Sequence, residues 1–296
     1  MRIEVIGSRG QLGRELLEVL QGTSHHATGH DLESVDITDP ASVAALLDAV
    51  RPDAVINCAA WTRVDAAEAE EEAARRVNAD GPRVLAQACQ ERGLLLSHLS
   101  TDYVFDGTAT RPIDESSAPH PQSAYGRTKL AGEEAVRAVL PRHQVVRTAW
   151  LYGQDGPNFV LTMLRLARER GALRVVDDQW GSPTWTGHLA PALVRLLERG
   201  VPGTYHLTGS GSTTWHGFAE VIVAEAGLAV PVEPLPTAEF PTPAPRPAYS
   251  VLDNRAWRDL GEPPLPDWRE GLRAYLRRRG DAPAGAAMGA PLKSTH

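Results

Sequence analysis

The sequence predicts an α/β fold, a Rossmann-like doubly wound parallel sheet followed by a smaller C-terminal α/β lobe. Three observations support this prediction. A β-branched run at residues 2–6 meets a glycine-rich turn at 7–13. Strands then alternate with helices to about residue 150, which is the pattern of a parallel sheet covered on both faces. The segment 94–99 is almost continuously apolar, as is typical of a parallel strand buried on both sides.

The elements of the first half follow from apolar spacing and from capping and breaking residues. Leucines at helical spacing follow the glycine turn, and Asp39 is a suitable N-cap for a helix that Pro40 opens. Gly93 and Pro141 end two later helices. The predicted order is strand 2–6, a helix after the turn, a second strand ending near residue 31, a helix from 40, strand 53–57, helix 72–92, strand 94–99, helix 124–140 and a strand from 144.

After residue 150 the pattern is more mixed. We expect helices near 157–171, 186–199, 215–227 and 267–279, and short strands near 173–176 and 204–207. Dense prolines predict an extended, irregular segment at 230–247. The predicted division is 1–150 for a dinucleotide-binding domain, to which later segments can return, 151–279 mainly for a substrate-binding lobe, and 280–296 for a disordered Ala/Gly/Pro-rich tail.

Composition and charge exclude several classes of protein. The chain has 296 residues, 42% of them hydrophobic, and a net charge of −7, so a general nucleic-acid binder, which should be basic, is disfavoured. We expect no membrane span and no signal sequence, and the two cysteines fit the reducing cytoplasm. His25, His26 and His30 are interpreted as part of a solvated loop, and no metal site is predicted.

The glycine turn has the spacing G-x-x-G-x-x-G, formed by Gly7, Gly10 and Gly13. Glycines permit a tight turn and close approach to a pyrophosphate, and the N-terminus of the following helix supplies N–H groups and partial positive charge. Its position between a strand and a helix supports a dinucleotide site. Asp31 and Asp36 are both candidates for the ribose and adenine side.

A second motif, Y-x-x-x-K, places Tyr125 and Lys129 on one face of a predicted helix. A nearby ammonium stabilises phenolate, so we expect Lys129 to lower the pKa of the Tyr125 phenol and make it an acid near neutral pH. Hydroxyl and carboxyl groups at Ser100, Thr101 and Asp102 follow the predicted strand 94–99, at the sheet edge where ligands bind. Hydroxyl, phenol, lysine and dinucleotide turn together predict carbonyl reduction by hydride transfer.

These motifs and others give the chain a family resemblance. It resembles the extended short-chain dehydrogenase/reductases, and within them the dTDP-4-dehydrorhamnose reductases. Matching stretches cover nearly the whole chain before the tail, and STDYVFDG and VVDDQWGSPT are far more specific than the glycine turn. The stretches are GSRGQLG (7–13), VDITDP (35–40), RPDAVINCAAWTRVDAAE (51–68), STDYVFDG (100–107), YGRTKLAGE (125–133), RTAWLYG (147–153), NFVLTML (158–164), VVDDQWGSPT (175–184), YHLTGSG (205–211) and RPAYSVLD (246–253).

The resemblance implies a role for each matching residue. Thr101, Tyr125 and Lys129 are the implied catalytic trio, with Tyr125 as proton donor and Lys129 holding the nicotinamide ribose. Thr101, Asp102 and Trp150 are implied to contact the sugar. The residues expected at an NADPH or NADH site are Gly7, Arg9, Gly10, Gln11, Leu12, Gly13, Asp31, Asp36, Ile37, Ala59, Ala60, Thr62, Tyr125 and Lys129.

The implied activity is NAD(P)H-dependent reduction of the 4-keto group of dTDP-4-dehydro-L-rhamnose to dTDP-L-rhamnose, with a homodimer as an implied assembly. Trp61 and Tyr249 depart from the usual family residues, so the exact dTDP-4-keto-6-deoxysugar stays open. Three alternatives remain, namely a 4-ketoreductase for another deoxysugar of secondary metabolism, a sugar-nucleotide 4-epimerase and a non-catalytic regulatory subunit. Retention of the trio favours an active enzyme.

Overall fold

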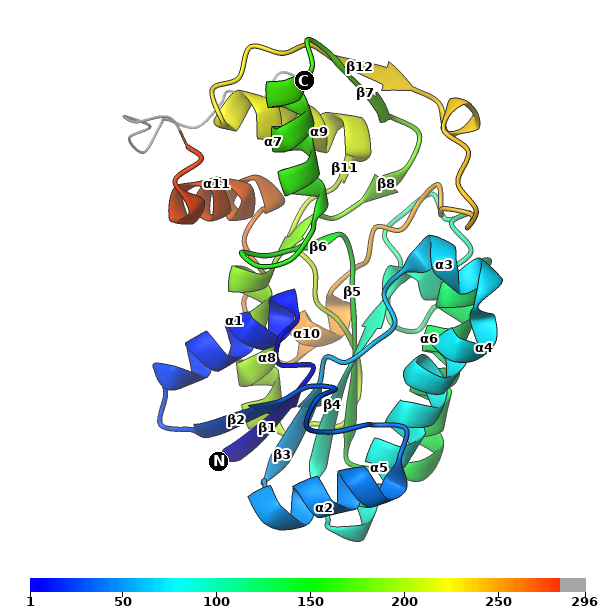
Figure 1. The fold of residues 1–296 in the computed structure, drawn as a ribbon, viewed down its shortest axis with the longest axis vertical. Helices are drawn as coiled ribbons and strands as arrows, with labels where there is room; N and C mark the ends of the chain where they lie inside the picture. Colours follow the sequence, from blue (N-terminus) through cyan, green and yellow to red (C-terminus); the bar gives the residue numbers. More distant parts are fainter. Residues whose placement is uncertain (283–296) are drawn as a thin grey trace.

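A six-stranded parallel sheet forms the centre of the computed structural model, which describes residues 1–282 (Figure 1). The spatial order is β10-β5-β4-β3-β1-β2, so the chain winds outward in opposite directions from β1. This confirms the predicted doubly wound, Rossmann-like sheet. The strands are β1 (Arg2–Ile6), β2 (His26–His30), β3 (Ala54–Asn57), β4 (Leu95–Thr101), β5 (His143–Thr148) and β10 (Gly203–His206).

Helices cover both faces of the sheet, because apolar side chains of the central strands point to both sides. On one face, α1 (Gln11–Gln21) and α8 (Thr186–Arg199) pack together over β1, β3 and β4. On the other lie α2 (Pro40–Val50), α5 (Gly81–Glu91) and α6 (Ala124–Val139). The Asp39 side chain accepts a hydrogen bond from the Ala41 N–H, which confirms the predicted cap of α2.

The predicted helix at 72–92 is continuous in direction but not in hydrogen-bonding pattern. It consists of α4 (Glu71–Arg75), a π-helical turn at Arg76–Asp80, and α5. A short helix precedes it, α3 (Val64–Ala69), which the sequence pattern did not predict. The π turn carries the fully buried Asn78. Single π turns are rare and are often found near functional sites.

The interpretation of the first histidines as a solvated loop is wrong for two of the three. His26 and His30 begin and end β2, paired in register with Arg2 and Ile6 of β1. Pairing with β1 overrides the weak strand propensity of this segment. His30 is held by a 2.8 Å hydrogen bond between its Nδ1 and the buried carboxylate of Glu4.

The second lobe is built around its own apolar cluster, formed mainly by α7 (Phe159–Glu169), α9 (Trp215–Glu225) and α11 (Trp268–Arg279) (Figure 1). Its strands are short and pair two by two. They are β6 (Leu151–Tyr152) with β9 (Thr184–Trp185), β7 (Leu173–Val176) with β12 (Val232–Leu235), and β8 (Trp180–Gly181) with β11 (Thr213–Thr214). This agrees with the predicted smaller α/β lobe.

The proline-dense segment is more ordered than the sequence pattern predicted. It contains β12 and a 3₁₀ turn at Thr237–Glu239. Pro234 fits inside β12 because this strand has a single partner, β7, and an edge strand tolerates a residue without an N–H. A further short helix, α10 (Arg255–Asp259), follows.

Three segments after residue 150 return to the large sheet, as the predicted division allowed. They are α8, which packs on α1, β10, which pairs with β5, and α10, which packs against β10. The division of the chain at residue 150 stays a prediction. Among the described residues, no helix is both long and apolar enough to cross a bilayer.

The start of the predicted tail is anchored in the structure. The carboxylate of Asp281 accepts hydrogen bonds from Arg168 at 2.8 Å and Arg279 at 3.1 Å, and Ala282 packs against the cluster of the second lobe. Gly280 caps α11, so the expected disorder is wrong for residues 280–282. Residues 283–296 lie outside the described part of the chain.

Ending the chain after Ala282 should therefore leave Tm and kcat/KM almost unchanged, whereas Asp281→Asn should lower Tm by about 2–4 °C. The substitution removes two ion pairs, with Arg168 and Arg279, worth about 1 kcal/mol in total, and a domain of this size loses a few degrees per kcal/mol. Calorimetry of both variants checks this. A large loss of Tm in the truncated chain would show that residues after 282 contribute to stability.

Candidate active site

The candidate site lies at the carboxyl ends of β1, β3 and β4. The sheet order reverses between β1 and β3, since β1 leads to β2 on one side and β3 leads to β4 on the other. In open α/β sheets, ligands bind in the crevice at such a switch point. The glycine turn follows β1, and Thr101 ends β4, so this edge collects both predicted motifs.

The glycine turn is packed too tightly for side chains. Gly7 has φ +78°, and a Cβ there would lie 2.6 Å from the Ala59 backbone nitrogen. A Cβ on Gly13 would lie 2.2 Å from the Gly7 carbonyl oxygen. Gly10 caps α1 without any side-chain hydrogen bond to the first turn, so the first N–H groups of α1 are free for an anion. This geometry fits a dinucleotide pyrophosphate.

Two residues of this turn can reach a cofactor through their backbone rather than their side chains. Leu12 is buried in the core beneath α1. The amide of Gln11 donates a 3.1 Å hydrogen bond to the Pro157 carbonyl of the second lobe. Their predicted role as cofactor residues stays a prediction.

Asp31 and Arg9 lie together at the end of β2. One Asp31 oxygen accepts the Arg9 N–H at 2.9 Å and the other accepts the Leu32 N–H at 2.8 Å. The guanidinium of Arg9 pairs with Glu33, and both of these side chains are mostly exposed. The carboxylate of Asp31 thus fixes the turn, while the charged end of Arg9 lies at the rim.

The loops after β2 and β3 hold the remaining predicted cofactor residues. Asp36 is exposed and caps its own turn through the Thr38 N–H and hydroxyl, which lower its pKa. Ile37 turns its side chain inward, where a Cβ on Gly81 would lie 2.6 Å from its Cδ1. The loop after β3 carries three further predicted cofactor residues, Ala59, Ala60 and Thr62.

Asn78 fixes the loop after β3, although it belongs to none of the sequence motifs. Its side chain accepts the Trp61 N–H at 2.8 Å and donates to the Trp61 carbonyl at 3.1 Å. It also donates to the Thr128 hydroxyl at 3.1 Å, which in turn donates to the Tyr125 carbonyl at 2.9 Å. The only sequence signal was a polar residue within an otherwise regular helical pattern.

The structure brings the three predicted catalytic residues together. Ser123 caps α6 by accepting the Gly126 N–H, so Tyr125 and Lys129 fall in its first two turns. The ammonium of Lys129 donates a 2.6 Å hydrogen bond to the Leu99 carbonyl near the end of β4. The Thr101 hydroxyl lies beside the Tyr125 phenol. Helix α6 and strand β4 therefore bring all three groups together at the carboxyl edge of the sheet.

The predicted acidification of Tyr125 by Lys129 is wrong for this structure. Burial raises the pKa of the Tyr125 phenol to about 12, the neighbouring Thr101 hydroxyl lowers it less, and Asp102 raises it further. Lys129 does not contribute, and its own pKa falls to about 8 because the ammonium is buried. Tyr125 is consequently a protonated donor throughout the neutral range rather than a partly ionised acid.

Asp102 is an unusual carboxyl group within this site. Its Oδ1 accepts the Thr101 hydroxyl at 3.0 Å, and the Ser250 hydroxyl lies beside the carboxylate, while the buried Oδ2 has no hydrogen bond of good geometry. Burial raises its pKa to about 6. An unsatisfied buried oxygen is costly, and a ligand hydroxyl would satisfy it. This agrees with the predicted sugar contact, which stays a prediction.

The Trp150 side chain is tightly packed at the start of the second lobe. It has φ +47°, a conformation unusual for a bulky residue. Its indole stacks on Trp215 with 3.5 Å between ring centroids, and a Cβ on Gly181 would lie 2.3 Å from it. Strain of this kind persists only where packing enforces it. The predicted contact of Trp150 with the sugar stays a prediction.

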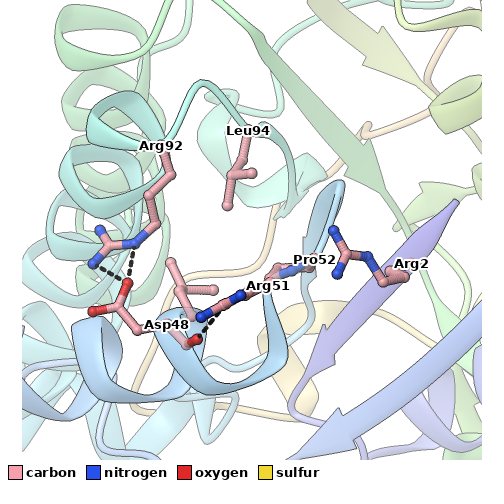
Figure 2. A pocket seen from close by; sticks show the side chains of 7 residues that line it. Arg2, Asp48, Arg51, Pro52, Arg92 and Leu94 are labelled. Carbon is pink, nitrogen blue, oxygen red and sulfur yellow. Dashed lines mark hydrogen bonds and ion pairs between the residues drawn. The ribbon is translucent and has the colours of Figure 1, made fainter.

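A cavity of about 330 Å³ lies at the opposite edge of the sheet (Figure 2). Arg2 at the start of β1 and Leu94 just before β4 line it, together with the Asp48–Arg92 ion pair. It is thus far from the carboxyl ends of the strands, where the motifs converge. Within residues 1–282, no group of three or more His, Cys, Asp or Glu side chains is placed to hold a metal ion.

Comparison with known proteins assigns the family. The model of the family described as "RmlD substrate binding domain" matches residues 1–280. The chain belongs to this family. It is 46% identical over 273–275 residues to relatives from Streptomyces, among them the dTDP-4-dehydrorhamnose reductase of Streptomyces griseus, with 90% of both chains covered. This confirms the resemblance to the dTDP-4-dehydrorhamnose reductases.

Two further family members are similar over most of their length. A probable dTDP-4,6-dihydroxy-2-methyloxan-3-one 4-ketoreductase of Streptomyces antibioticus is 47% identical, covering 92% of this chain and 94% of the relative. The crystal structure of the dTDP-4-dehydrorhamnose reductase of Bacillus anthracis in complex with NADP has a TM-score of 0.92 and 40% identity, covering 94% of this chain and 99% of that one.

Proposed function

We propose that this enzyme reduces the 4-keto group of dTDP-4-dehydro-L-rhamnose to give dTDP-L-rhamnose, with NADPH or NADH as cofactor. The observation that carries the proposal is the placement of Thr101, Tyr125 and Lys129 at the carboxyl end of β4, beside a glycine turn shaped for a dinucleotide. The names of the family members that match the chain support it.

The residues of this chain have distinct parts in such a reduction. The bound cofactor supplies the hydride. Tyr125, protonated at neutral pH, holds the proton that the substrate oxygen needs, and Thr101 beside it orients that oxygen by a hydrogen bond. Lys129 places a buried positive charge near the end of β4, where negative charge develops on the substrate oxygen. The Gly7 turn, Asp31 and the loop carrying Ala60 hold the cofactor.

A second candidate is a 4-ketoreductase for another dTDP-deoxysugar. The similarity to the 4-ketoreductase of Streptomyces antibioticus favours it as much as the other relatives favour rhamnose. Trp61 and Tyr249, which depart from the family pattern, lie in the loop after β3 and beside Trp180. Both candidates share the chemistry of the site and differ in the sugar.

Oxidation of NADPH with enzymatically generated dTDP-4-dehydro-L-rhamnose tests the proposal, with the product identified by NMR. We expect dTDP-L-rhamnose as product and a higher kcat/KM than with dTDP-4-keto-6-deoxy-D-glucose. The reverse ranking would favour the second candidate. If NADPH were oxidised with neither of the two sugars, both candidate functions would be contradicted. Tyr125→Phe serves as the catalytic control.

The cofactor preference should be modest, within about 10–30-fold in kcat/KM. Asp31 is placed to accept ribose hydroxyls and favours NADH, whereas the rim guanidinium of Arg9 can leave Glu33 for a 2′-phosphate and favours NADPH. Arg9→Ala should impair NADPH use and spare NADH. Because Asp31 also holds the Arg9 N–H, Asp31→Asn is the milder change, and we expect it to weaken NADH use. Equal losses with both cofactors in Arg9→Ala would contradict this balance.

The proposal also covers the cellular location and the assembly of the enzyme. We infer a cytoplasmic location, which the two free cysteines, Cys58 and Cys89, support. A homodimer is the assembly that the resemblance implies. Size-exclusion chromatography with light scattering would measure the mass in solution.

A further inference from the structure

A short segment of the chain crosses from the Rossmann domain to the second lobe beside the site. We call residues 244–250 the strap. At its first end, Asp65 of α3 receives two hydrogen bonds from it. The Ala244 N–H donates to Oδ1 at 3.2 Å and the Arg246 guanidinium donates to Oδ2 at 2.8 Å. Arg246 also donates to the Ala244 carbonyl at 3.3 Å, which closes the connection.

The second end of the strap is held by backbone hydrogen bonds. The Tyr249 N–H donates to the Gly107 carbonyl at 3.1 Å, and the Trp180 N–H donates to the Ala248 carbonyl at 2.8 Å. Gly107 has φ +81°, and a Cβ on it would lie 2.6 Å from Pro247 Cα. The strap therefore presses directly on the loop that begins with Thr101.

The ion pair between Arg246 of the strap and Asp65 lies close to the proposed reacting groups. Both Arg246 and Asp65 influence the pKa of the Tyr103 phenol, which burial raises. The Tyr103 ring packs edge-on against Tyr125, with 5.5 Å between centroids. Arg246 is largely buried, with 18% of its side chain exposed, and Asp65 is half-exposed. The charges of the ion pair are thus felt at Tyr103, whose ring contacts the proton donor.

We propose that Asp65 and Arg246 are positioning residues for the sugar nucleotide, because their ion pair holds the strap against the loop from Thr101 to Gly107. The strap cannot hold itself there, since Pro245 and Pro247 lack N–H donors and its first half contacts the Rossmann domain through Asp65. The inference rests on the proposed function, and it adds two residues outside the catalytic trio that determine substrate affinity.

Asp65→Asn, Arg246→Gln and the double variant test the proposal. Each single variant should raise the KM for dTDP-4-dehydro-L-rhamnose about fivefold, as loss of a partly shielded ion pair predicts. The double variant should be no worse than either single variant, because the pair acts as one unit. The Kd of NADPH, measured by fluorescence, should stay within about twofold of wild type.

Arg174→Gln is the matched control. Arg174 of β7 pairs at 2.7 Å with Glu239, which lies in the proline-dense segment before the strap. The KM of this variant should not change. Gly107→Ala is an independent variant that displaces the strap without altering charge, and it should raise the KM in the same way. Tm values of all variants separate this effect from a general loss of stability.

Additive losses in the double variant, an equal effect of Arg174→Gln, or a matching rise in the Kd of NADPH would overturn the proposal. Calorimetric titration with dTDP provides a readout that needs no turnover. If wild-type protein reduces neither sugar, the proposed function fails, yet weaker dTDP binding confined to the Asp65, Arg246 and Gly107 variants would still support the strap. Unchanged dTDP binding and unchanged KM would refute it.

Discussion

Tyr125→Phe should lower kcat by roughly 10²–10⁴-fold, which is the usual contribution of a general acid, and leave NADPH binding nearly intact. The phenol is partly buried and stays protonated near neutral pH, because desolvation raises its pKa to about 12. Phenylalanine keeps the ring that packs against Tyr103 and removes only the proton donor. Steady-state kinetics with both cofactors, together with fluorescence titration of NADPH, measure the two effects.

Tyr103→Phe is the matched control for this prediction. It removes a second phenol in contact with Tyr125 but not the proposed donor, so kcat should fall far less. If Tyr125→Phe kept more than about a third of the wild-type kcat, or if Tyr103→Phe lost as much, the assignment of Tyr125 as proton donor would be wrong.

Glu133→Gln should destabilise the fold by about 3–5 kcal/mol, because it breaks a buried ion pair and leaves a charge uncompensated. Glu133 is fully buried one turn after Lys129 and accepts hydrogen bonds from Arg147 at 2.9 and 2.7 Å and from Arg137 at 2.5 Å. Arg147 is 2% exposed. At a few degrees per kcal/mol, Tm should fall on the order of 10 °C.

The pH dependence of stability provides a second measurement. Burial by itself raises the pKa of Glu133, but the hydrogen bonds and charge of Arg147, the Ser100 hydroxyl and the charge of Arg137 together hold the pKa below its usual value. The stabilisation is therefore complete above the unfolded-state pKa of about 4.3 and is lost as pH falls through the lower folded-state pKa. Glu133→Gln should lack this acid-dependent component.

Glu169→Gln is the surface control, since the Arg165–Glu169 pair is similarly short at 2.7 Å but more than half exposed. It should cost no more than about 0.5 kcal/mol. Equal losses of Tm in the Glu133 and Glu169 variants would show that burial of the Arg147 network contributes nothing to stability.

Local sequence determined much of the sheet and its glycine turn. The apolar runs at 2–6 and 94–99 and the cap at Asp39 require only neighbouring residues, and the structure contains the corresponding strands and helix. The Y-x-x-x-K spacing likewise placed Tyr125 and Lys129 within one helix. Periodicity and capping are local properties, so a single sequence is enough to predict them.

Tertiary structure alone decided how the site is tuned and held. The sequence spacing suggested that Lys129 acidifies Tyr125, but burial of the phenol dominates its pKa and the ammonium is bound to the Leu99 carbonyl. The Arg246–Asp65 contact joins residues 181 positions apart. Burial and long-range contacts depend on how distant segments pack, and no local pattern of the sequence records them.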